Sequence, residues 1–275
     1  MNIGINPQHF QKAALWEEDR TIFETFDLGS DAGFKCLDFS IGDRVTAEKV
    51  AEYISLKGIT VNQSHMPMNR YAKKDFEEFK KDVMCHAENA KLMGSKILVV
   101  HGDEYDYSSV YSRQTALEFN YKLSYDLVDF AAKNGMKVAF ENVFDEKEVA
   151  KGWRYCSFVD DLCDLVDKYK SDHVGICWDT GHASAQYKYK NIEAMRVAGK
   201  RIIATHIHDN IYDLDLHMFP FLGEINWKEL MLALKEIGYE GDFSLELVYD
   251  RIPKALAPDY LKVLYKSAEY LVNLV

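Results

Sequence analysis

Short apolar runs alternate with longer helical patterns along the whole chain. Eight of the runs have the length and the turn-residue boundaries of β-strands. They occupy residues 2–6, 36–40, 60–64, 96–101, 137–142, 174–179, 201–208 and 243–247. Between them, apolar side chains recur every three or four positions, which is the spacing of one buried face of a helix. The pattern therefore predicts eight β-then-α units.

Two helical segments show this spacing. The apolar stripe of residues 75–93 consists of Phe76, Phe79, Val83, Ala87 and Ala90. The stripe of the last segment consists of Leu261, Leu264, Ala268, Leu271 and Val275. Asp75 with Glu78, and Asn226 with Glu229, have the spacing of a capping box, which predicts that helices begin at both places.

Eight such units in 275 residues predict an α/β fold, a single (β/α)₈ TIM barrel that spans residues 1–275 as one domain. No Pro-, Gly- or Ser-rich linker marks a boundary within the chain. A doubly wound open sheet is the alternative architecture. It usually has a Gly-rich phosphate-binding turn after its first strand, and the segment NIGINPQHF has none.

Composition and charge narrow the functional classes. Hydrophobic residues make up 48% of the chain and charged residues 28%, which is typical of a globular protein. Lys and Arg number 33 against 44 Asp and Glu, so the formal net charge is −11, which argues against a nucleic-acid-binding face. The start of the chain lacks the basic region of a signal peptide, and no stretch reaches the roughly 18 apolar residues of a membrane span. We therefore expect a cytoplasmic protein without a membrane partner.

The five cysteines are odd in number and show no C-x-x-C spacing, so we expect reduced thiols. Cys177 falls in a predicted core strand. It is interpreted as a small buried residue rather than as a nucleophile.

Polar residues collect where the predicted strands end. In a TIM barrel the active site lies at the carboxyl ends of the strands. The candidates at these ends and just beyond them are His65, His101, Glu141, Asp179, His182, His206, His208, Asp215, His217 and Glu246. A lone residue of this kind is often only a hydrogen-bonded rim residue. Ten carboxylates and imidazoles in one concave mouth would repel one another and be poorly solvated without cations, so the set predicts a divalent metal site.

Other catalytic chemistries lack a motif. The sequence contains no G-x-S-x-G nucleophile elbow, no Walker-type phosphate loop and no H-E-x-x-H zinc motif.

Seven short segments occur in the order and spacing of a known family. They are SHMP (64–67), VVHG (99–102), FENV (140–143), CWDTGH (177–182), THIHDN (205–210), DLH (215–217) and SLEL (244–247). In combination they resemble the xylose-isomerase-like TIM-barrel superfamily over essentially the whole chain. That superfamily holds the sugar phosphate isomerases/epimerases and, as a relative, the endonuclease IV type of abasic-site nuclease.

The resemblance implies roles for particular residues. Glu141, Asp179, His206 and Glu246 match the four ligands of one divalent metal in the isomerase/epimerase branch. The two glutamates would stand on opposite faces of the sugar and transfer a proton through a metal-bound enediolate, while His182 would orient a substrate hydroxyl. Mixed carboxylate and imidazole ligands suit Mn²⁺, Zn²⁺, Co²⁺ or Fe²⁺.

The same resemblance leaves a second branch open. His65, His101, His182, Asp215 and His217 match the additional positions that complete a three-zinc cluster in the nuclease branch. Because many members that look like sugar isomerases carry this extra set, the ligands alone do not decide, and we expect one metal per chain rather than three.

The sequence also departs from the family pattern in the segment DLHMFPFLGEINW. Ile225 and Asn226 stand where relatives more often have glycine and an acid, and His208 stands where relatives often have Asn or Lys. His208 is therefore interpreted either as an extra metal ligand or substrate contact, or as a hydrogen-bonding residue that supports the metal ligands.

The balance favours a metal-dependent sugar or sugar-phosphate isomerase/epimerase, or a related polyol or keto-sugar dehydratase. The acidic net charge, the glutamate pair and aromatic residues in rim segments support it. Those aromatic residues are Trp16, Trp153, Tyr155, Phe219 and Phe221. Trp153, His208 and Arg251 are candidate substrate contacts, and Arg154 is a weaker candidate for a phosphate group.

The alternative is an endonuclease IV-like zinc phosphodiesterase that acts on abasic DNA. Its support is the full ligand set and one basic, aromatic segment, residues 69–74, in which Tyr71 is the sole candidate to wedge a duplex. A non-catalytic binding protein fits the intact ligand set poorly. A homodimer or homotetramer is an expectation at the level of the family only.

Overall fold

The computed structural model describes residues 1–67, 76–102, 112–145, 154–248 and 251–274. Its strands are β1 (Ile3–Ile5), β2 (Cys36–Asp38), β3 (Thr60–His65), β4 (Ile97–His101), β5 (Lys137–Glu141), β6 (Val174–Asp179), β7 (Ile202–His206) and β8 (Phe243–Leu245). All pair in parallel, in the order β7-β6-β5-β4-β3-β2-β1-β8. A parallel bridge between Ile207 and Leu245 joins the two outer strands, so the sheet forms a nearly closed barrel.

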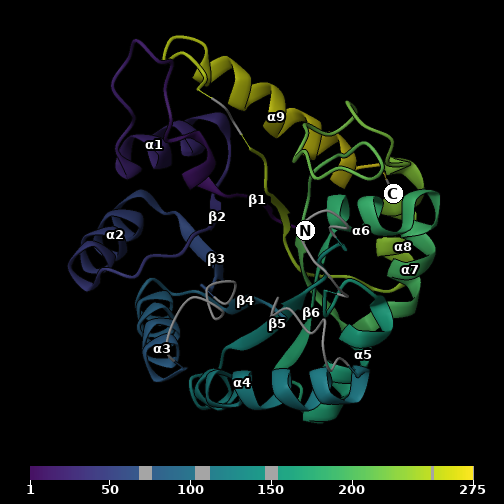
Figure 1. Ribbon diagram of the computed structural model, residues 1–275. Helices are drawn as coiled ribbons and strands as arrows, with labels where there is room; N and C mark the ends of the chain where they lie inside the picture. The colour runs from purple at the N-terminus through teal and green to yellow at the C-terminus, as the bar shows by residue number, and fades with distance from the viewer. Residues whose placement is uncertain (68–75, 103–111, 146–153, 249–250, 275) are drawn as a thin grey trace.

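Helices surround the strands on the outside (Figure 1). They are α1 (Ile22–Ala32), α2 (Arg44–Lys57), α3 (Phe76–Leu92), α4 (Arg113–Lys133), α5 (Val159–Tyr169), α6 (Thr180–Tyr187), α7 (Asn191–Ala198), α8 (Trp227–Glu236) and α9 (Ala257–Val272). Short 3₁₀ turns lie at η1 (Pro7–Phe10), η3 (Lys188–Lys190) and η4 (Gly199–Arg201). The order of strands and helices confirms the predicted (β/α)₈ barrel. None of the described helices is both long and apolar enough to cross a membrane.

The apolar stripes predicted from the sequence face the core. Phe79, Val83, Ala87 and Ala90 of α3 are buried, as are the first four predicted residues of the α9 stripe. Asn226 caps α8, and its side chain accepts a hydrogen bond from the Glu229 amide at 3.3 Å. The Asp75 cap and Val275 lie outside the described residues.

The barrel interior explains why the polar residues gather at one end. Four small or β-branched side chains on neighbouring strands form a separate interior cluster: Val99, Ala139, Cys177 and Ala204. Alternate side chains of a strand point to the same face, so the residue two positions later also faces inward. Those later residues, each at the carboxyl end of its strand, are His101, Glu141, Asp179 and His206. The buried, apolar position expected for Cys177 is confirmed.

A buried arginine fixes the first loop of the barrel mouth. Arg20 is 5% exposed, and its guanidinium donates to the carbonyls of Phe10 at 3.1 Å and Lys12 at 2.9 Å. It also donates to the Ile252 carbonyl at 2.9 Å, which ties the first loop to the segment after β8. The turn η1 is held at the mouth in this way.

Replacement of Arg20 by methionine should lower the free energy of unfolding by roughly 3 kcal/mol, because three carbonyls lose a charged donor. Urea unfolding followed by circular dichroism would measure the loss. The control is Arg44→Met, which removes an exposed arginine paired with Glu48 and should cost less than about 0.5 kcal/mol. Equal losses in the two variants would contradict the role assigned to Arg20.

Candidate functional site

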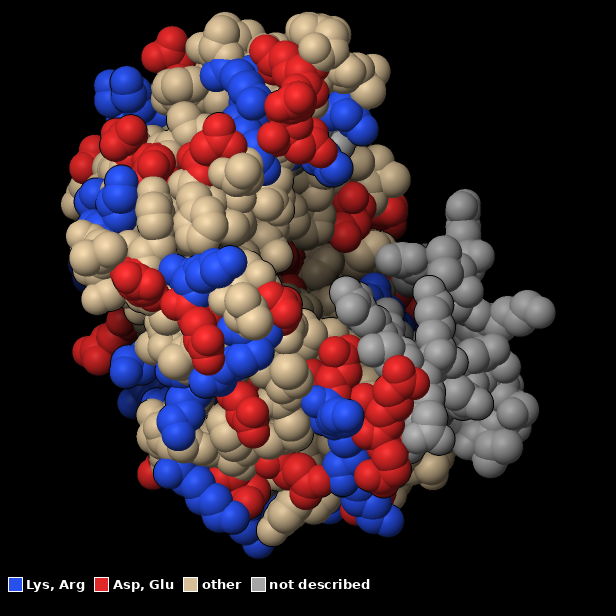
Figure 2. Space-filling view, turned by 90° about the vertical axis from the view of Figure 1, so that its left-hand side faces the viewer, with Lys and Arg blue, Asp and Glu red and all other residues tan. Residues whose placement is uncertain are grey.

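A pocket of about 660 Å³ opens at the carboxyl ends of the strands. Seven of the ten residues singled out in the sequence line its walls, namely His65, His101, Glu141, His182, Asp215, His217 and Glu246. The face shown in Figure 2 is hollowed near its middle, with acidic side chains visible inside the hollow. The strand ends therefore bring the predicted residues to one concave site.

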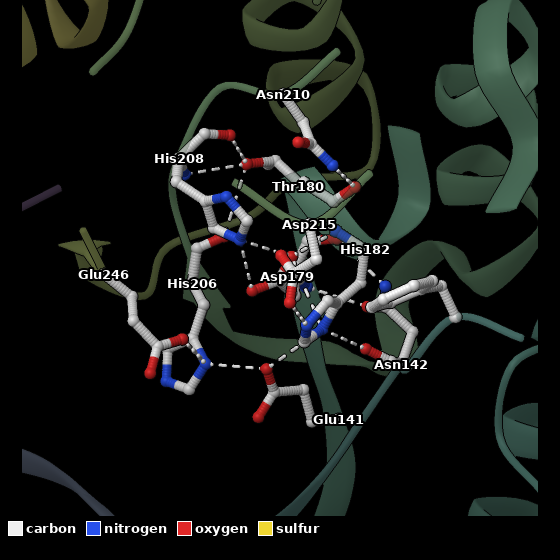
Figure 3. Close-up of polar contacts among 12 residues, drawn as sticks. Glu141, Asn142, Asp179, Thr180, His182, His206, His208, Asn210, Asp215 and Glu246 are labelled. Atoms are coloured by element: carbon white, nitrogen blue, oxygen red, sulfur yellow. Dashed lines mark hydrogen bonds and ion pairs between the residues drawn. The ribbon is translucent and has the colours of Figure 1, made fainter. Parts of the chain in front are cut away.

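Four residues form a central group: Glu141, Asp179, His206 and Glu246. Each offers one ligand atom, and these atoms all lie within 4.8 Å of one another. His206 lies between the two glutamates, with its Nδ1 2.9 Å from Glu141 Oε1 and 3.0 Å from Glu246 Oε2 (Figure 3). Glu141, Asp179 and His206 are almost completely buried, and only Glu246 keeps some exposure to solvent.

Charges within the central group control each other's protonation. Burial alone would raise the pKa of Glu141, but His206 and His101 outweigh it and hold that pKa well below its usual range. Burial acts in the same direction on Glu246, and His206 and His9 likewise bring its pKa well below the usual range. Burial would lower the pKa of His206, but Cys177 and the two glutamates raise it well above its usual value.

This donor set fits a divalent cation. It combines three carboxylates with one imidazole in a space that excludes most water, where a negative charge without a nearby counter-charge is costly. Carboxylate oxygen together with imidazole nitrogen is a ligand combination suited to Mn²⁺, Zn²⁺ or Co²⁺.

A second group adjoins the first and shares Glu141 with it. His65 Nε2 lies 3.2 Å from Glu141 Oε2 and 3.1 Å from His101 Nε2. His101 Nε2 lies 3.2 Å from the same carboxylate oxygen. Glu141 thus offers one oxygen to each group.

A third group consists of His182, Asp215 and His217. The Asp215 carboxylate lies 3.4 Å from His182 Nε2 and 3.3 Å from His217 Nε2. Burial opposes the charged form of each imidazole, but Asp179 and Asp215 outweigh it and raise the pKa of His182 to about 9. Against the same opposition, Asp215 and Glu246 raise the pKa of His217 to about 10.

Backbone carbonyls orient three of these imidazoles. The Nδ1 atom of His65 lies 3.0 Å from the Met66 carbonyl oxygen. The Nδ1 atom of His182 lies 2.9 Å from the Asn142 carbonyl oxygen, and that of His217 lies 3.1 Å from the Glu246 carbonyl oxygen. A proton on Nδ1 that is donated to a carbonyl leaves the Nε2 lone pair free for a cation.

The D-T-G-H segment couples a strand end to a helix start. Asp179 ends β6 and caps α6, because its Oδ1 accepts from the His182 amide at 2.6 Å. Asp179 also accepts from His208 Nε2 at 2.9 Å. A Cβ atom on Gly181 would lie 1.9 Å from the His208 ring, so only glycine fits there.

The predicted substrate contacts do not come together in the described structure. His208 is fully buried, stacks on His217 with ring centroids 4.0 Å apart, and is absent from the pocket wall. Its contact with Asp179 fits the other interpretation of His208 from the sequence, as a residue that supports the metal ligands. Arg251 is exposed and does not line the pocket, whereas Arg154 does. Trp153 lies outside the described residues.

Among the other rim aromatics of the sequence, none lines the described pocket wall. Tyr155 is a core residue, and Trp16 is 81% exposed. Phe219 packs against Tyr260, and Phe221 against Trp227. The expected aromatic cover is therefore not formed by these four residues.

Two further residues near the site are not among the ten candidates of the sequence. His9, on η1, lines the pocket, and its Nε2 lies 3.7 Å from Glu246 Oε1. Asp38, at the end of β2, lies 2.8 Å from His206 Nε2. A signal existed for Asp38, because it is the one charged residue in the apolar run CLDFS.

Asp209 organises the loop that follows β7. One of its oxygens accepts from the amides of Asn210 at 2.9 Å and Ile225 at 3.2 Å. The other accepts from the Phe221 amide and from Trp227 Nε1, both at 2.9 Å. These contacts fix residues 209–227, which carry Asp215 and His217 of the third group.

The comparisons place this architecture in a family. Residues 26–267 match the family model described as xylose isomerase-like TIM barrel, and the chain belongs to that family. An uncharacterized protein of Methanocaldococcus jannaschii is 30% identical over 181 residues, 64% of this chain and 60% of the relative. The inosose isomerase of Bacillus velezensis is 29% identical over 158 residues, 54% of this chain and 52% of that enzyme. The chain thus spans less than two thirds of the length of these curated relatives.

Solved structures share the fold over nearly the whole chain. A D-tagatose 3-epimerase-like protein superposes with a TM-score of 0.76 at 22% identity, covering 99% of this chain and 98% of the other. The IolI protein with a bound zinc atom gives a TM-score of 0.77 at 19% identity, covering 99% of this chain and 98% of the other. An AP endonuclease, family 2, from Brucella melitensis gives a TM-score of 0.71 at 16% identity, covering 96% and 98%.

Replacement of Asp209 by asparagine should destabilise the protein by roughly 2–4 kcal/mol, because an amide NH₂ would face backbone donors that need an acceptor. Tryptophan fluorescence during urea unfolding would follow the loop through Trp227. Asp213→Asn removes an exposed carboxylate paired with Lys188 and should change stability by less than about 0.5 kcal/mol. An Asp209 variant as stable as the Asp213 variant would show that the loop does not depend on this carboxylate.

Proposed function

We propose that this chain is a divalent-metal-dependent isomerase or epimerase of a sugar or sugar phosphate. The observation that carries the proposal is the central group, in which two glutamates flank one imidazole at the floor of the pocket. Support comes from relatives whose names are inosose isomerase and D-tagatose 3-epimerase-like protein.

Glu141, Asp179, His206 and Glu246 would hold the cation. A bound divalent cation would polarise a substrate carbonyl and make the neighbouring C–H more acidic.

The two glutamates have the protonation state that proton transfer needs. Their lowered pKa values keep both ionised at neutral pH, so either can accept a proton from carbon. In epimerisation, one carboxylate takes the C–H proton, and the electron pair of that bond moves into an enediolate. The other carboxylate must first take up a proton from solvent, which it then delivers to the opposite face of the enediolate. The first carboxylate afterwards returns its proton to solvent, so no net proton is gained or lost. In isomerisation, or in loss of a hydroxyl from the same enediolate, the first step is identical.

His182 and His9 would position the substrate. His182 lines the pocket, and its raised pKa of about 9 keeps it protonated at neutral pH, so it can donate a hydrogen bond to a substrate hydroxyl. His9 also lines the pocket, and its Nε2 lies 3.7 Å from Glu246 Oε1. A sugar within this pocket would therefore meet imidazoles from both η1 and α6.

One observation favours a second candidate, an endonuclease IV-like phosphodiesterase. The five additional residues form two further donor groups beside the central one. Against it, basic and acidic side chains alternate over the face shown in Figure 2, and the net charge of −11 would repel a DNA backbone. The basic segment 69–74 lies outside the described residues.

Metal content and a substrate panel separate the two candidates. Elemental analysis of the purified protein should give about one Mn, Co or Zn per chain, and ketoses, aldoses, inososes and their phosphates should be tested with that metal present. Two or three zinc atoms per chain, cleavage of abasic DNA and no turnover of any sugar would replace the proposed function with the second candidate.

Replacement of Glu246 by glutamine should abolish turnover and weaken cation binding, because the amide can neither accept the C–H proton nor carry the ligand charge. Exchange of substrate C–H for deuterium from D₂O, followed by NMR, would measure the chemical step directly. The control is Glu240→Gln, an exposed glutamate outside the pocket wall, which should keep wild-type turnover. Deuterium exchange by the Glu246 variant at the wild-type rate would remove this residue from the mechanism.

Cation binding by the central group should release protons at pH 7 and tighten as the pH rises. His206 has a pKa well above its usual value in the metal-free protein, so it is protonated at pH 7 and must lose a proton to become a ligand. If the third group also binds a cation, His182 and His217, with pKa values of about 9 and about 10, must lose their protons as well, and the tightening continues toward about pH 10. Calorimetry in two buffers of different ionisation enthalpy would count the protons.

His217→Ala serves as the comparison. If only the central group binds a cation, this variant should release as many protons as the wild type. If the third group also binds one, the variant should release fewer protons and bind fewer cations per chain. Cation binding without proton release would contradict the protonation states assigned above.

A further inference from the structure

A buried carboxylate lies directly beneath the central group. Asp38 is 3% exposed, and its Oδ2 lies 2.8 Å from His206 Nε2 and 3.1 Å from the amide nitrogen of Gln63. Its Oδ1 is buried without a hydrogen-bond partner among the described residues. Neither the family motifs of the sequence nor the proposed mechanism uses this residue.

His206 is oriented differently from three of the other candidate ligands. In His65, His182 and His217, Nδ1 faces a backbone carbonyl and Nε2 faces a carboxylate of the site. His206 reverses this arrangement, because its Nδ1 faces Glu141 and Glu246 while its Nε2 faces Asp38. Its orienting partner is a side-chain carboxylate rather than a backbone carbonyl.

We propose that Asp38 is a positioning residue that keeps the proton of His206 on Nε2 and thereby presents the Nδ1 lone pair to the cation. This inference rests on the proposed function in one respect, namely that the central group binds a divalent cation. A carboxylate behind a ligating imidazole fixes the ring and its tautomer and makes the ligating nitrogen more basic.

The surroundings of Asp38 hold its carboxylate in place facing His206. No ion pair with Lys or Arg is found for Asp38 within the described part of the chain. Gln63 donates its amide hydrogens to Asp38 and to the Thr205 carbonyl, at 3.1 Å and 3.4 Å, which holds the carboxylate from the side. Since Asp38 and Gln63 are paired across β2 and β3, the backbone register sets this geometry.

The first test measures Zn²⁺ affinity by competition with a chromophoric chelator. It uses a His65→Ala/His217→Ala background, in which only the central group keeps all of its donors. Asp38→Ala should raise the Kd for Zn²⁺ by about 10- to 100-fold. Asp38→Asn should raise it less, because the amide oxygen can still accept from Nε2–H but carries no charge. Asp242→Asn is the matched control, since that carboxylate contacts Asn2 and Cys36 at the other end of the barrel, and should leave the Kd unchanged.

The second test observes the hydrogen bond itself and needs no cation. In protein labelled with ¹⁵N-histidine, the Nε2–H proton of His206 should be a downfield signal protected from exchange, with and without Zn²⁺. The signal should move upfield in Asp38→Asn, vanish in Asp38→Ala and persist in Asp242→Asn. Circular dichroism of each variant would show that the fold is retained.

The outcomes separate this inference from the function it rests on. Failure of the background protein to bind Zn²⁺ would overturn the cation of the proposed function and, with it, the role of Asp38. Zn²⁺ binding that Asp38→Ala weakens by less than twofold, or the absence of a protected His206 Nε2 proton in the wild type, would overturn the role of Asp38 alone.

Discussion

Unbalanced negative charge at the barrel mouth is the constraint on which the rest of the site depends. Three carboxylates meet one imidazole where little water can enter, and each must be compensated by a proton or a cation. In the metal-free protein the histidines supply that compensation by holding protons, which is why their pKa values rise while those of Glu141 and Glu246 fall. A divalent cation would displace these protons, so the imidazoles serve either as counter-charges or as ligands.

The barrel and the principal donors could be predicted from the sequence because both follow from local rules. Side chains of a β-strand alternate between its two faces. A small inward-facing residue followed two positions later by a polar one therefore identifies both the inner face of the strand and its carboxyl end. Glu141 after Ala139 and Asp179 after Cys177 illustrate this. The predicted strands differ from the observed ones mainly at their ends, as in β7, where the ladder stops at His206 and Ile207 makes only an isolated bridge.

Other parts of the site could not be predicted because they depend on contacts between distant segments. Asp38 and His206 are 168 positions apart, and their contact requires the closed barrel. His9 approaches Glu246 through the packing of the first loop, which Arg20 ties to the segment after β8. His208 looks like a substrate contact in the sequence because it follows a strand, but the turn after β7 buries it behind Asp179. Which side chain faces the pocket is decided by how the loops pack.

The close approach of Gly181 to the His208 ring has a consequence for how this family can diversify. A larger side chain at position 181 cannot be accepted while an imidazole occupies position 208. Loss of the imidazole first would leave Asp179 without one of its donors, but would open the space next to the helix start. The two positions are therefore expected to change in a fixed order along any lineage, with 208 before 181. A barrel of this type with a bulky residue two positions after the aspartate that ends strand six should then lack the buried histidine, and its aspartate would need another donor.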